Sequence, residues 1–390
     1  MFFMHIAINA HLLAHTQNFR RAGVSIYTEE LLRHLALIDR HNRYTVYTTR
    51  GLDAAALGLP PNFAVRPSRL PTINPRIRIP WEQCLAPLLL RLAGADVFHG
   101  VQSVAPLFCP VPSVITIHDL SPITFPQTFR AHNRIYLTWA TRASARRAAR
   151  ILTVSEFSKQ EIVRILGVSP ERVVVTYNAC DARFAPPDPA AVAAFRRRAG
   201  LPERFILFLG TLEPRKNLPT LLEAYARIAA STDAPLIIGG GKGWLYDAIF
   251  ARVEALNLGQ RVRFVGYVDA AEQPLWYAAA TVFVFPSLYE GFGIPPLEAM
   301  ACGTPVIAST SSSLPEVVGD AGLLVPPTDA EALGAAIVRL LEDAGLRAEL
   351  RERGLRQARR FSWRTTAERT LAVYQEAGTT PSPSQAEAAS

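Results

Sequence analysis

The sequence predicts an α/β protein made of two doubly wound halves that face each other across a cleft. Short apolar runs alternate with amphipathic segments along most of the 390 residues, which is typical of parallel strands joined by helices. This length suits two hydrophobic cores better than one. A segment rich in proline and charge interrupts the alternation near the middle, and we place the connection between the halves there.

Each half contains the expected series of elements in order. The first half, residues 1–180, opens with the strand-like run HIAINA and continues through helical patterns such as SIYTEELLRHLALI. The connection covers residues 181–203. The second half, residues 204–360, runs from the strand FILFLG to the helix DAEALGAAIVRLLED. Residues 361–377 predict one more helix, and the small polar residues 378–390 predict a disordered tail.

Composition narrows the function classes. The chain is 49% hydrophobic and 19% charged, and it has no apolar run near the roughly 20 residues that a membrane-spanning helix needs. The amino terminus lacks the basic segment of a signal peptide, so we expect a cytoplasmic protein. Its four cysteines show no paired spacing, which argues against a structural zinc site or a disulfide framework.

The basic charge is concentrated in the first half. Residues 1–185 hold 21 Lys and Arg against 11 Asp and Glu, whereas residues 186–390 hold 20 against 22. A basic half fits an anionic membrane surface, a nucleic acid or a phosphorylated substrate, but it also fits arginines that serve solubility alone. Four of the arginines are predicted on one helix, where they either contact a membrane surface or form a solvated face. They are Arg142, Arg146, Arg147 and Arg150.

The stretch YEGFGIPPLEAMACGTPVIAS carries two carboxylates, Glu290 and Glu298. It follows the buried strand TVFVFPS, so Glu290 is expected in the loop and Glu298 in the first turn of the next helix. Backbone N–H groups from Gly293 onward and the helix dipole favour an anion there. Carboxylates accept hydrogen bonds from vicinal hydroxyls, so one acid for each sugar beside a diphosphate explains the pair. If Glu298 only complements the dipole, Glu290 stays unexplained.

Two further stretches place polar side chains at strand ends. In FLGTLEPRKN, Arg215 and Lys216 are positioned to neutralise a departing diphosphate without a metal ion, although an ordinary solvated turn also fits. In VITIHDLSP, His118 and Asp119 end a strand, where a lone histidine is more often structural. The run GGGKGW matches neither a P-loop nor a dinucleotide fingerprint. There is also no D-x-D pair, so we predict no metal and no cofactor.

The segment EGFGIPPLE resembles the E-x7-E signature of the retaining family-4 glycosyltransferases, which have the GT-B fold, and GTPVIAS continues the resemblance. The similarity extends through FSWRTTAERTLAVY. It implies an acceptor-binding first half, a second half that binds the nucleotide sugar, and a last helix that returns to the first half. It also implies that Glu290 and His118 meet the donor sugar, that Glu298 meets the ribose and that Lys216 binds the diphosphate.

The same resemblance completes the predicted site. Thr211 stands where many members have an arginine, and Arg215 is the nearby candidate to replace it. Gly23 matches a glycine-rich loop on the acceptor side, with Ala22 in place of the usual first glycine, and Asp119 is assigned to the same side. The remaining donor-binding residues are Gly210, Val268, Gly291, Phe292, Gly293 and Ile294.

The resemblance implies transfer of a sugar, with retention, from a nucleoside diphosphate to a hydroxyl of a saccharide or lipid-linked saccharide. The style of GTLEPRKN suggests mannose, with GDP-mannose as donor, in surface polysaccharide or glycolipid assembly. An anionic membrane surface at the inner face of the cell membrane is a possible partner, and nucleic acid is not expected. A sugar-nucleotide epimerase or a phosphorylase of the same fold, and a non-catalytic basic membrane- or nucleic-acid-binding protein, remain as alternatives.

Overall fold

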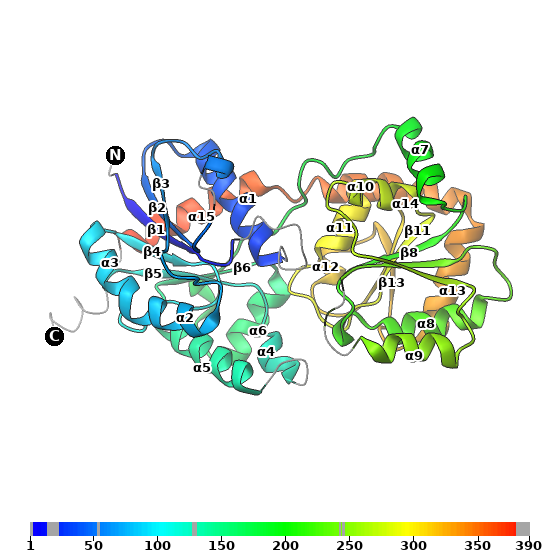
Figure 1. The fold of residues 1–390 in the computed structure, drawn as a ribbon, viewed down its shortest axis with the longest axis horizontal. Coiled ribbons are helices and arrows are strands. Elements are labelled where there is room, and N and C mark those ends of the chain that lie inside the picture. Colours follow the sequence, from blue (N-terminus) through cyan, green and yellow to red (C-terminus); the bar gives the residue numbers. More distant parts are fainter. Residues whose placement is uncertain are drawn as a thin grey trace. The chain divides into compact units, whose positions relative to one another are not determined.

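The computed structural model describes residues 3–13, 23–52, 55–126, 131–241, 243 and 246–379. The chain divides into two compact units, one made of Met1–Asn178 with Ser362–Ser390 and the other of Ala179–Phe361. Each unit has a parallel sheet with helices on both faces (Figure 1). The prediction of an α/β protein with two doubly wound sheets is therefore confirmed.

The first sheet has seven parallel strands in the order β3-β2-β1-β4-β5-β6-β7. The order reverses between β1 and β4, which both pair with their neighbours in register, so that Ile8 lies opposite Val46 on one side and His99 on the other. Ligands of such sheets bind beyond the carboxyl ends of the strands at the reversal. The strands are β1 (His5–Ala10), β2 (Arg43–Thr48), β3 (Phe63–Pro67), β4 (Val97–Gly100), β5 (Ser113–Ile117), β6 (Arg150–Thr153) and β7 (Val173–Val175).

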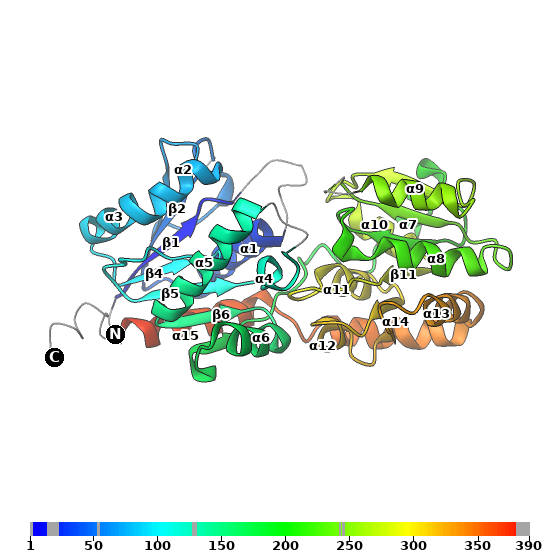
Figure 2. The ribbon, with the colours of Figure 1, turned by 90° about the horizontal axis from the view of Figure 1, so that it is seen from below.

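Helices cover both faces of this sheet. Helix α15 packs against α1 and against β4, β5 and β6, and its Tyr374 hydrogen-bonds His99 within the sheet. Helices α2, α3 and α5 lie on the opposite face (Figure 2), where Trp81 and Leu90 join the buried core. The helices of this unit are α1 (Gly23–Ile38), α2 (Pro75–Pro80), a π-helical turn (Trp81–Leu85), α3 (Ala86–Ala93), α4 (Ser121–Thr124), α5 (Ala131–Arg147), α6 (Glu156–Leu166) and α15 (Trp363–Gly378).

The second sheet has six parallel strands in the order β10-β9-β8-β11-β12-β13, so its reversal lies between β8 and β11. Ile206 of β8 pairs with Val282 of β11 and with Leu236 of β9. The four inner strands, β8, β9, β11 and β12, are buried along their length, which explains their continuous apolar runs, whereas the edge strands β10 and β13 are only partly buried. They are β8 (Ile206–Leu209), β9 (Leu236–Gly239), β10 (Val262–Gly266), β11 (Val282–Phe285), β12 (Val306–Ser309) and β13 (Gly322–Val325).

Helices of the second unit pack in two groups. Helix α8 packs against α9 and α13, while α11 packs against α10 and α14. The bounds of these elements are α7 (Pro189–Ala199), α8 (Leu218–Ile228), α9 (Asp247–Ala255), α10 (Gln273–Ala279), α11 (Ile294–Ala301), α12 (Leu314–Val318), α13 (Ala330–Glu342) and α14 (Ala344–Ala358).

Several elements differ from the expected series. Strand β3 and the helical run from α2 to α3 form in a stretch whose sequence pattern is irregular. The pattern is irregular because prolines interrupt it. The predicted connection, residues 181–203, contains α7, which packs on α10 within the second unit. Arg150 begins strand β6 rather than extending α5, so it does not share a helix with Arg142. Of the predicted tail, residues 380–390 lie outside the described residues.

Candidate active site

The loops that follow β8 and β11 meet at the reversal point of the second sheet. Asn217, with a left-handed φ of 58°, turns the first loop into α8 and donates its side-chain N–H to Pro286 O at 3.0 Å. Arg215 O accepts hydrogen bonds from Leu288 N at 2.9 Å and from Ser287 Oγ at 3.0 Å. Residues about 70 positions apart are thus joined by one backbone–backbone and two side chain–backbone hydrogen bonds, which fix the place of the side chains between them.

Glu290 lies at the centre of this junction and is 7% exposed. Its Oε1 accepts hydrogen bonds from Lys216 Nζ and Ser287 Oγ, both at 2.6 Å, and its Oε2 accepts from Arg215 Nη1 at 3.1 Å. Burial alone would raise the pKa of Glu290. The charges of Lys216 and Arg215 outweigh that effect, and the hydrogen bonds add to them, so the pKa lies below its ordinary value. Glu290 is therefore a carboxylate with both oxygens engaged.

Both predicted phosphate-binding cations face carboxylates. Lys216 pairs with Glu290 and lies 5.0 Å from the ring centroid of Phe285. Arg215 contacts Glu213 at 2.9 Å, Glu290 at 3.1 Å and the carbonyl oxygen of Tyr289 at 2.8 Å. The guanidinium of Arg215 thus holds two acids and a backbone oxygen in place. A diphosphate that approaches Lys216 competes with Glu290 for the ammonium group.

Serines that sequence reasoning missed hold the backbone around Glu290. Ser312 Oγ accepts a hydrogen bond from Glu290 N at 2.9 Å, and the buried Ser313 Oγ lies 3.0 Å from Glu290 O and 2.6 Å from Phe292 O. Ser287 contacts the carboxylate directly. Only Ser287 had a usable signal, because it is a polar residue directly after a buried strand. Ser312 and Ser313 come from the segment after β12 and stand in a run of serines without a distinguishing pattern.

Glycines let the loops after β8 and β9 approach each other closely. Gly210 N donates to Gly239 O at 3.0 Å, and Leu212 N donates to Gly241 O at 3.0 Å. Gly240 has a φ of 150°, and a Cβ added there would lie 1.8 Å from Gly210 O. The backbone positions of the predicted donor-binding residues Gly210 and Thr211 therefore require the close approach that the glycines at 239–241 allow. Val268 is also buried beside Gly239, at the carboxyl end of β10.

The segment Gly291–Ile294 turns the chain into α11. Gly293 has a φ of 111°, which favours glycine, and α11 begins at Ile294. Pro295 and Pro296 lack N–H groups, so they remove two of the donors that the first turn of a helix normally offers. The ring of Phe292 is 3% exposed and packs edge-on against Phe361 at 5.4 Å. Phe292 therefore contributes its backbone and a core contact at this place.

Glu298 lies in the second turn of α11, not in the first turn as predicted, because α11 begins at Ile294. Its Oε2 accepts a hydrogen bond from Tyr277 Oη of α10 at 2.9 Å. Burial raises the pKa of Glu298 to about 7, although the Tyr277 hydrogen bond and the charge of Arg183 act in the opposite direction. Complementing the helix dipole does not explain a buried carboxyl in this turn. Tyr277 is a further residue that the sequence pattern did not identify.

The remaining predicted residues lie in the first unit. His118 follows β5, and its Nε2 donates to Val101 O at 3.0 Å while its ring packs edge-on against Tyr27. Burial lowers the pKa of His118, against the raising effects of Val101 O and Asp119, so the ring is neutral with Nδ1 as acceptor. Asp119 Oδ1 accepts from Ser121 N and Oγ and thereby holds the turn into α4. Gly23 begins α1, and Ala22 lies outside the described residues.

Both halves of the sequence match families of known proteins. Residues 21–184 match the family described as Glycosyltransferase Family 4, and residues 193–357 match the one described as Glycosyl transferases group 1. Over 265 residues the chain is 41% identical to the O-antigen chain mannosyltransferase B of Escherichia coli, a match that covers 67% of this chain and 70% of that protein. The chain belongs to glycosyltransferase family 4. This family membership makes it a glycosyltransferase.

A second relative and a solved structure are also similar to this chain. The glycosyltransferase is 30% identical over 265 residues to the serotype-specific mannosyltransferase WbdA of Escherichia coli, covering 66% of this chain but only 32% of WbdA. Among solved structures, the sucrose-phosphate synthase of Thermosynechococcus elongatus matches with a TM-score of 0.78 at 24% identity, over 96% of this chain and 98% of that one. The fold of the glycosyltransferase is GT-B.

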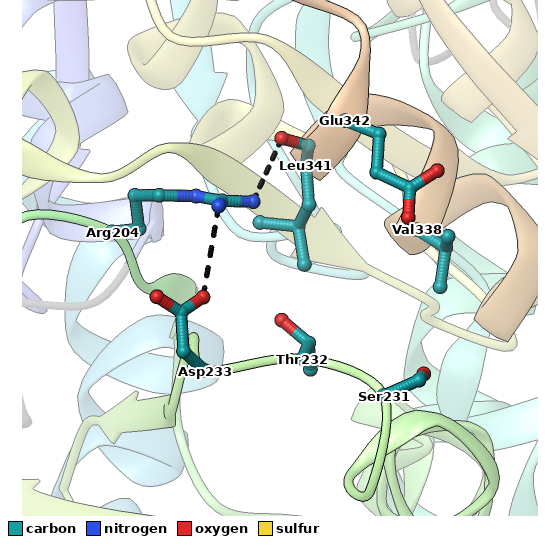
Figure 3. Close-up of a pocket in the computed structure, with 7 residues that line it drawn as sticks. All are labelled: Arg204, Ser231, Thr232, Asp233, Val338, Leu341 and Glu342. Carbon is teal, nitrogen blue, oxygen red and sulfur yellow. Dashed lines mark hydrogen bonds and ion pairs between the residues drawn. The ribbon is translucent and has the colours of Figure 1, made fainter.

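Other features of the glycosyltransferase lie outside the site. The second unit has a cavity of about 290 Å³, where Arg204 donates to Leu341 O at 2.8 Å. Figure 3 shows the residues that line it, with Arg204 directed toward Leu341 and Asp233. Arg204 and Asp233 precede β8 and β9, so this cavity is at the amino edge of the sheet, away from Glu290. In the part of the chain that is described, no three His, Cys, Asp or Glu side chains group as metal ligands. None of the described helices is long and apolar enough to cross a bilayer.

Proposed function

We propose that this glycosyltransferase transfers mannose, with retention of configuration, from GDP-mannose to a hydroxyl of a saccharide during surface polysaccharide assembly. The buried contact of Lys216 with Glu290 at the β8–β11 reversal carries the proposal, because it places a cation for a diphosphate beside an acceptor for sugar hydroxyls. The relatives called mannosyltransferases support the choice of mannose. The match covers 70% of mannosyltransferase B but only 32% of WbdA, so the identity of the sugar is proposed here together with the reaction.

In the proposed reaction, the bond from the anomeric carbon to the diphosphate oxygen breaks while the acceptor oxygen forms a bond to that carbon. The proton of the acceptor hydroxyl passes to an oxygen of the leaving diphosphate. Lys216 stabilises the negative charge that develops on the diphosphate. The charge of Lys216 makes a metal ion unnecessary for this step, so we propose a reaction without metal or other cofactor.

Glu290 has the role of holding the donor sugar. Its carboxylate oxygens are bound by Lys216, Ser287 and Arg215, and an attack on the anomeric carbon would require it to leave these partners. Hydrogen bonds from two vicinal hydroxyls can instead join or replace them with the carboxylate in place. Glu298 is assigned to the ribose on the same principle, with Tyr277 fixing its orientation. His118 is assigned to the donor sugar through Nδ1.

The test is turnover with purified protein and a panel of nucleoside diphosphate sugars, measured as release of nucleoside diphosphate with and without a mannoside acceptor. We expect GDP-mannose to be preferred and release to require the acceptor. The anomeric configuration of the product, read by NMR, tests retention. Product without acceptor would indicate an epimerase, consumption of inorganic phosphate a phosphorylase, and absence of any nucleotide-sugar reaction a binding protein.

The matched variants are Glu290→Gln and Glu223→Gln. Glu290→Gln removes the charge at the site, and we expect kcat to fall by about 100-fold or more. Glu223 pairs with Arg252 on the surface of the same unit, with both side chains 40% exposed, so Glu223→Gln should leave kcat unchanged. Wild-type turnover by folded Glu290→Gln would refute the assigned role.

A further inference from the structure

The reversal of the first sheet, between β1 and β4, gathers polar side chains outside the site around Glu290. Asn9 lies near the carboxyl end of β1, opposite Gly100 of β4. Asn9 Oδ1 accepts a hydrogen bond from His11 N at 3.3 Å, and Gln102 follows Gly100 by two residues. Ligands of doubly wound sheets bind beyond the carboxyl ends of the strands at such a reversal. A ligand of the first unit is therefore expected at this place.

Glu82 contacts the reversal from the π-helical turn Trp81–Leu85. It is 5% exposed, and its Oε1 accepts a hydrogen bond from Asn9 Nδ2 at 2.9 Å. The N–H of Ala86 bonds to the carbonyl oxygen of Trp81, five residues back rather than four, so the turn is wider than that of an α-helix. Turns of this kind are rare and occur often at functional sites. Glu82 is therefore placed by an unusual piece of backbone.

The carboxylate of Glu82 has few hydrogen-bond donors. Arg78 Nε lies 3.5 Å from Oε1, which is longer than a charge-assisted hydrogen bond. Within the described residues, Asn9 is the one hydrogen-bond donor to Glu82. A carboxylate offers about four acceptor positions. Burial raises the pKa of Glu82, against the lowering effects of Arg78 and Asn9. A buried acid with most of its acceptor positions unused is explained by a ligand that donates hydrogen bonds to it.

Polar atoms on neighbouring side chains also lack partners. Within the described residues, His11 Nε2, Gln102 Nε2 and Tyr136 Oη are buried without a hydrogen-bond partner. The ring of His11 packs edge-on against Trp81 at 4.1 Å. Tyr136 belongs to α5, on the same face of the sheet as α2 (Figure 2), and burial together with the charge of Glu82 raises its pKa to about 12. Buried polar atoms are almost always hydrogen-bonded, so these atoms also indicate a polar ligand.

We propose that these five residues bind the saccharide acceptor, with Glu82 accepting hydrogen bonds from two vicinal hydroxyls of the sugar. We call them the polar cluster, and its members are Asn9, His11, Glu82, Gln102 and Tyr136. Hydroxyls both donate and accept hydrogen bonds, so Tyr136 Oη and Gln102 Nε2 can donate to the same sugar while Glu82 accepts from it.

The charges of the polar cluster favour a neutral sugar. Glu82 and Arg78 carry opposite charges and compensate each other, so no net positive charge is left for a phosphate group. A buried group that hydrogen-bonds a hydroxyl rejects analogues that lack it. Glu82 is therefore a specificity-determining residue for the acceptor. This inference rests on the proposed function, because it identifies the residues that hold the acceptor of that reaction.

The first test compares acceptor and donor kinetics with methyl α-mannoside and GDP-mannose. Glu82→Gln keeps an oxygen for Asn9 but replaces the second oxygen, so the KM for the mannoside should rise about 10- to 100-fold. The KM for GDP-mannose and the Kd for GDP should be unchanged. The control is Glu161→Gln, which alters another buried glutamate of the first unit, paired with Arg164 at 3.2 Å, and should leave both KM values unchanged. An unchanged mannoside KM in folded Glu82→Gln would overturn the inference.

Tyr136→Phe distinguishes a ligand site from a purely structural cluster. Removing an unpartnered buried hydroxyl should keep or raise the unfolding temperature of the free protein, yet raise the KM for the mannoside about 2- to 10-fold. Tyr225→Phe in the second unit removes a hydroxyl that donates to Ala234 O at 3.0 Å, so it should lower the unfolding temperature and leave the KM unchanged. A lower unfolding temperature with a wild-type KM in Tyr136→Phe would show that the hydroxyl serves the fold alone.

Binding measured by saturation-transfer NMR tests the same site without turnover. The probes are methyl α-mannoside and its monodeoxy analogues. We expect analogues that lack a hydroxyl bound by Glu82 to bind the wild type more weakly than the mannoside does, and Glu82→Gln to discriminate less between them. Displacement of the mannoside by inorganic phosphate would overturn the choice of a neutral sugar. Specific mannoside binding without turnover of GDP-mannose would refute the proposed reaction but support the polar cluster as a sugar site.

Discussion

Replacing Lys216 with methionine should destabilise the second unit measurably. The ammonium group lies 2.6 Å from Glu290 Oε1, and the two residues are 8% and 7% exposed. Removing one partner of a buried ion pair typically costs about 3–5 kcal/mol. Because Glu290 keeps Arg215 and Ser287 as partners, we expect the lower end, about 3 kcal/mol. For a unit of this size this corresponds to a fall in Tm of roughly 6–12 °C.

A double-mutant cycle with Glu290→Gln isolates the interaction. Glu290→Gln leaves the Lys216 ammonium group without its carboxylate, and Lys216→Met leaves Glu290 with Arg215 as its remaining cation. The double variant removes both partners together. We expect the double variant to be more stable than the sum of the single losses predicts, by about 2 kcal/mol. The measurement is thermal and denaturant unfolding followed in parallel by fluorescence and circular dichroism. Arg252→Met, which breaks the exposed pair with Glu223, should cost less than about 1 kcal/mol.

Additive losses within about 0.5 kcal/mol would refute the reasoning. They would mean that Lys216 and Glu290 do not interact in the folded protein, so that the two side chains are held by separate surroundings. A loss at Lys216→Met as small as that at Arg252→Met would have the same meaning, because it would place the ammonium group in water.

Three further results are expected. The pKa of Glu298 is raised to about 7, so the folded state binds the extra proton between about pH 4.5 and 7, and its stabilising contribution is lost as the pH rises through that window. Glu298→Gln should remove this pH dependence, about 3 kcal/mol in the free energy of unfolding; a wild-type profile in the variant would contradict it. Gly240→Ala should cost at least about 4 kcal/mol because of the clash with Gly210 O, whereas Gly259→Ala, with nothing within 4 Å of the added Cβ, should be nearly neutral in denaturant unfolding. Turnover should be unchanged by EDTA, and recovery by added Mg²⁺ after its loss would contradict a reaction without metal.

The alternating pattern was enough to predict two doubly wound sheets, because buried parallel strands leave continuous apolar runs. The irregular stretch before β4 was not predictable, since its prolines break the period that identifies helices, yet α2 and α3 form there. Arg150 illustrates the boundary problem. The run of arginines continues past the end of α5, and only strand pairing shows that Arg150 opens β6.

The motifs identified the residues of the site but not their contacts. Lys216 and Glu290 are expected from the sequence at the diphosphate and at the sugar, as separate groups. Their direct ion pair forms because β8 and β11 are neighbours in the sheet, and the local sequence pattern does not predict the strand order. Tyr277 and Ser313 contact the predicted residues from other elements, α10 and the segment after β12. Such supporting contacts are long-range, so they become visible only when the fold is known.

The most direct test of the central claim, that Lys216 at the β8–β11 reversal binds the diphosphate of the donor, is calorimetric titration of GDP into wild type, Lys216→Met and Arg252→Met. Loss of one charge-assisted hydrogen bond contributes about 1.5–3 kcal/mol, so we expect the Kd of Lys216→Met to rise about 10- to 100-fold. Arg252→Met should bind GDP like the wild type. An unchanged Kd in folded Lys216→Met would contradict the claim.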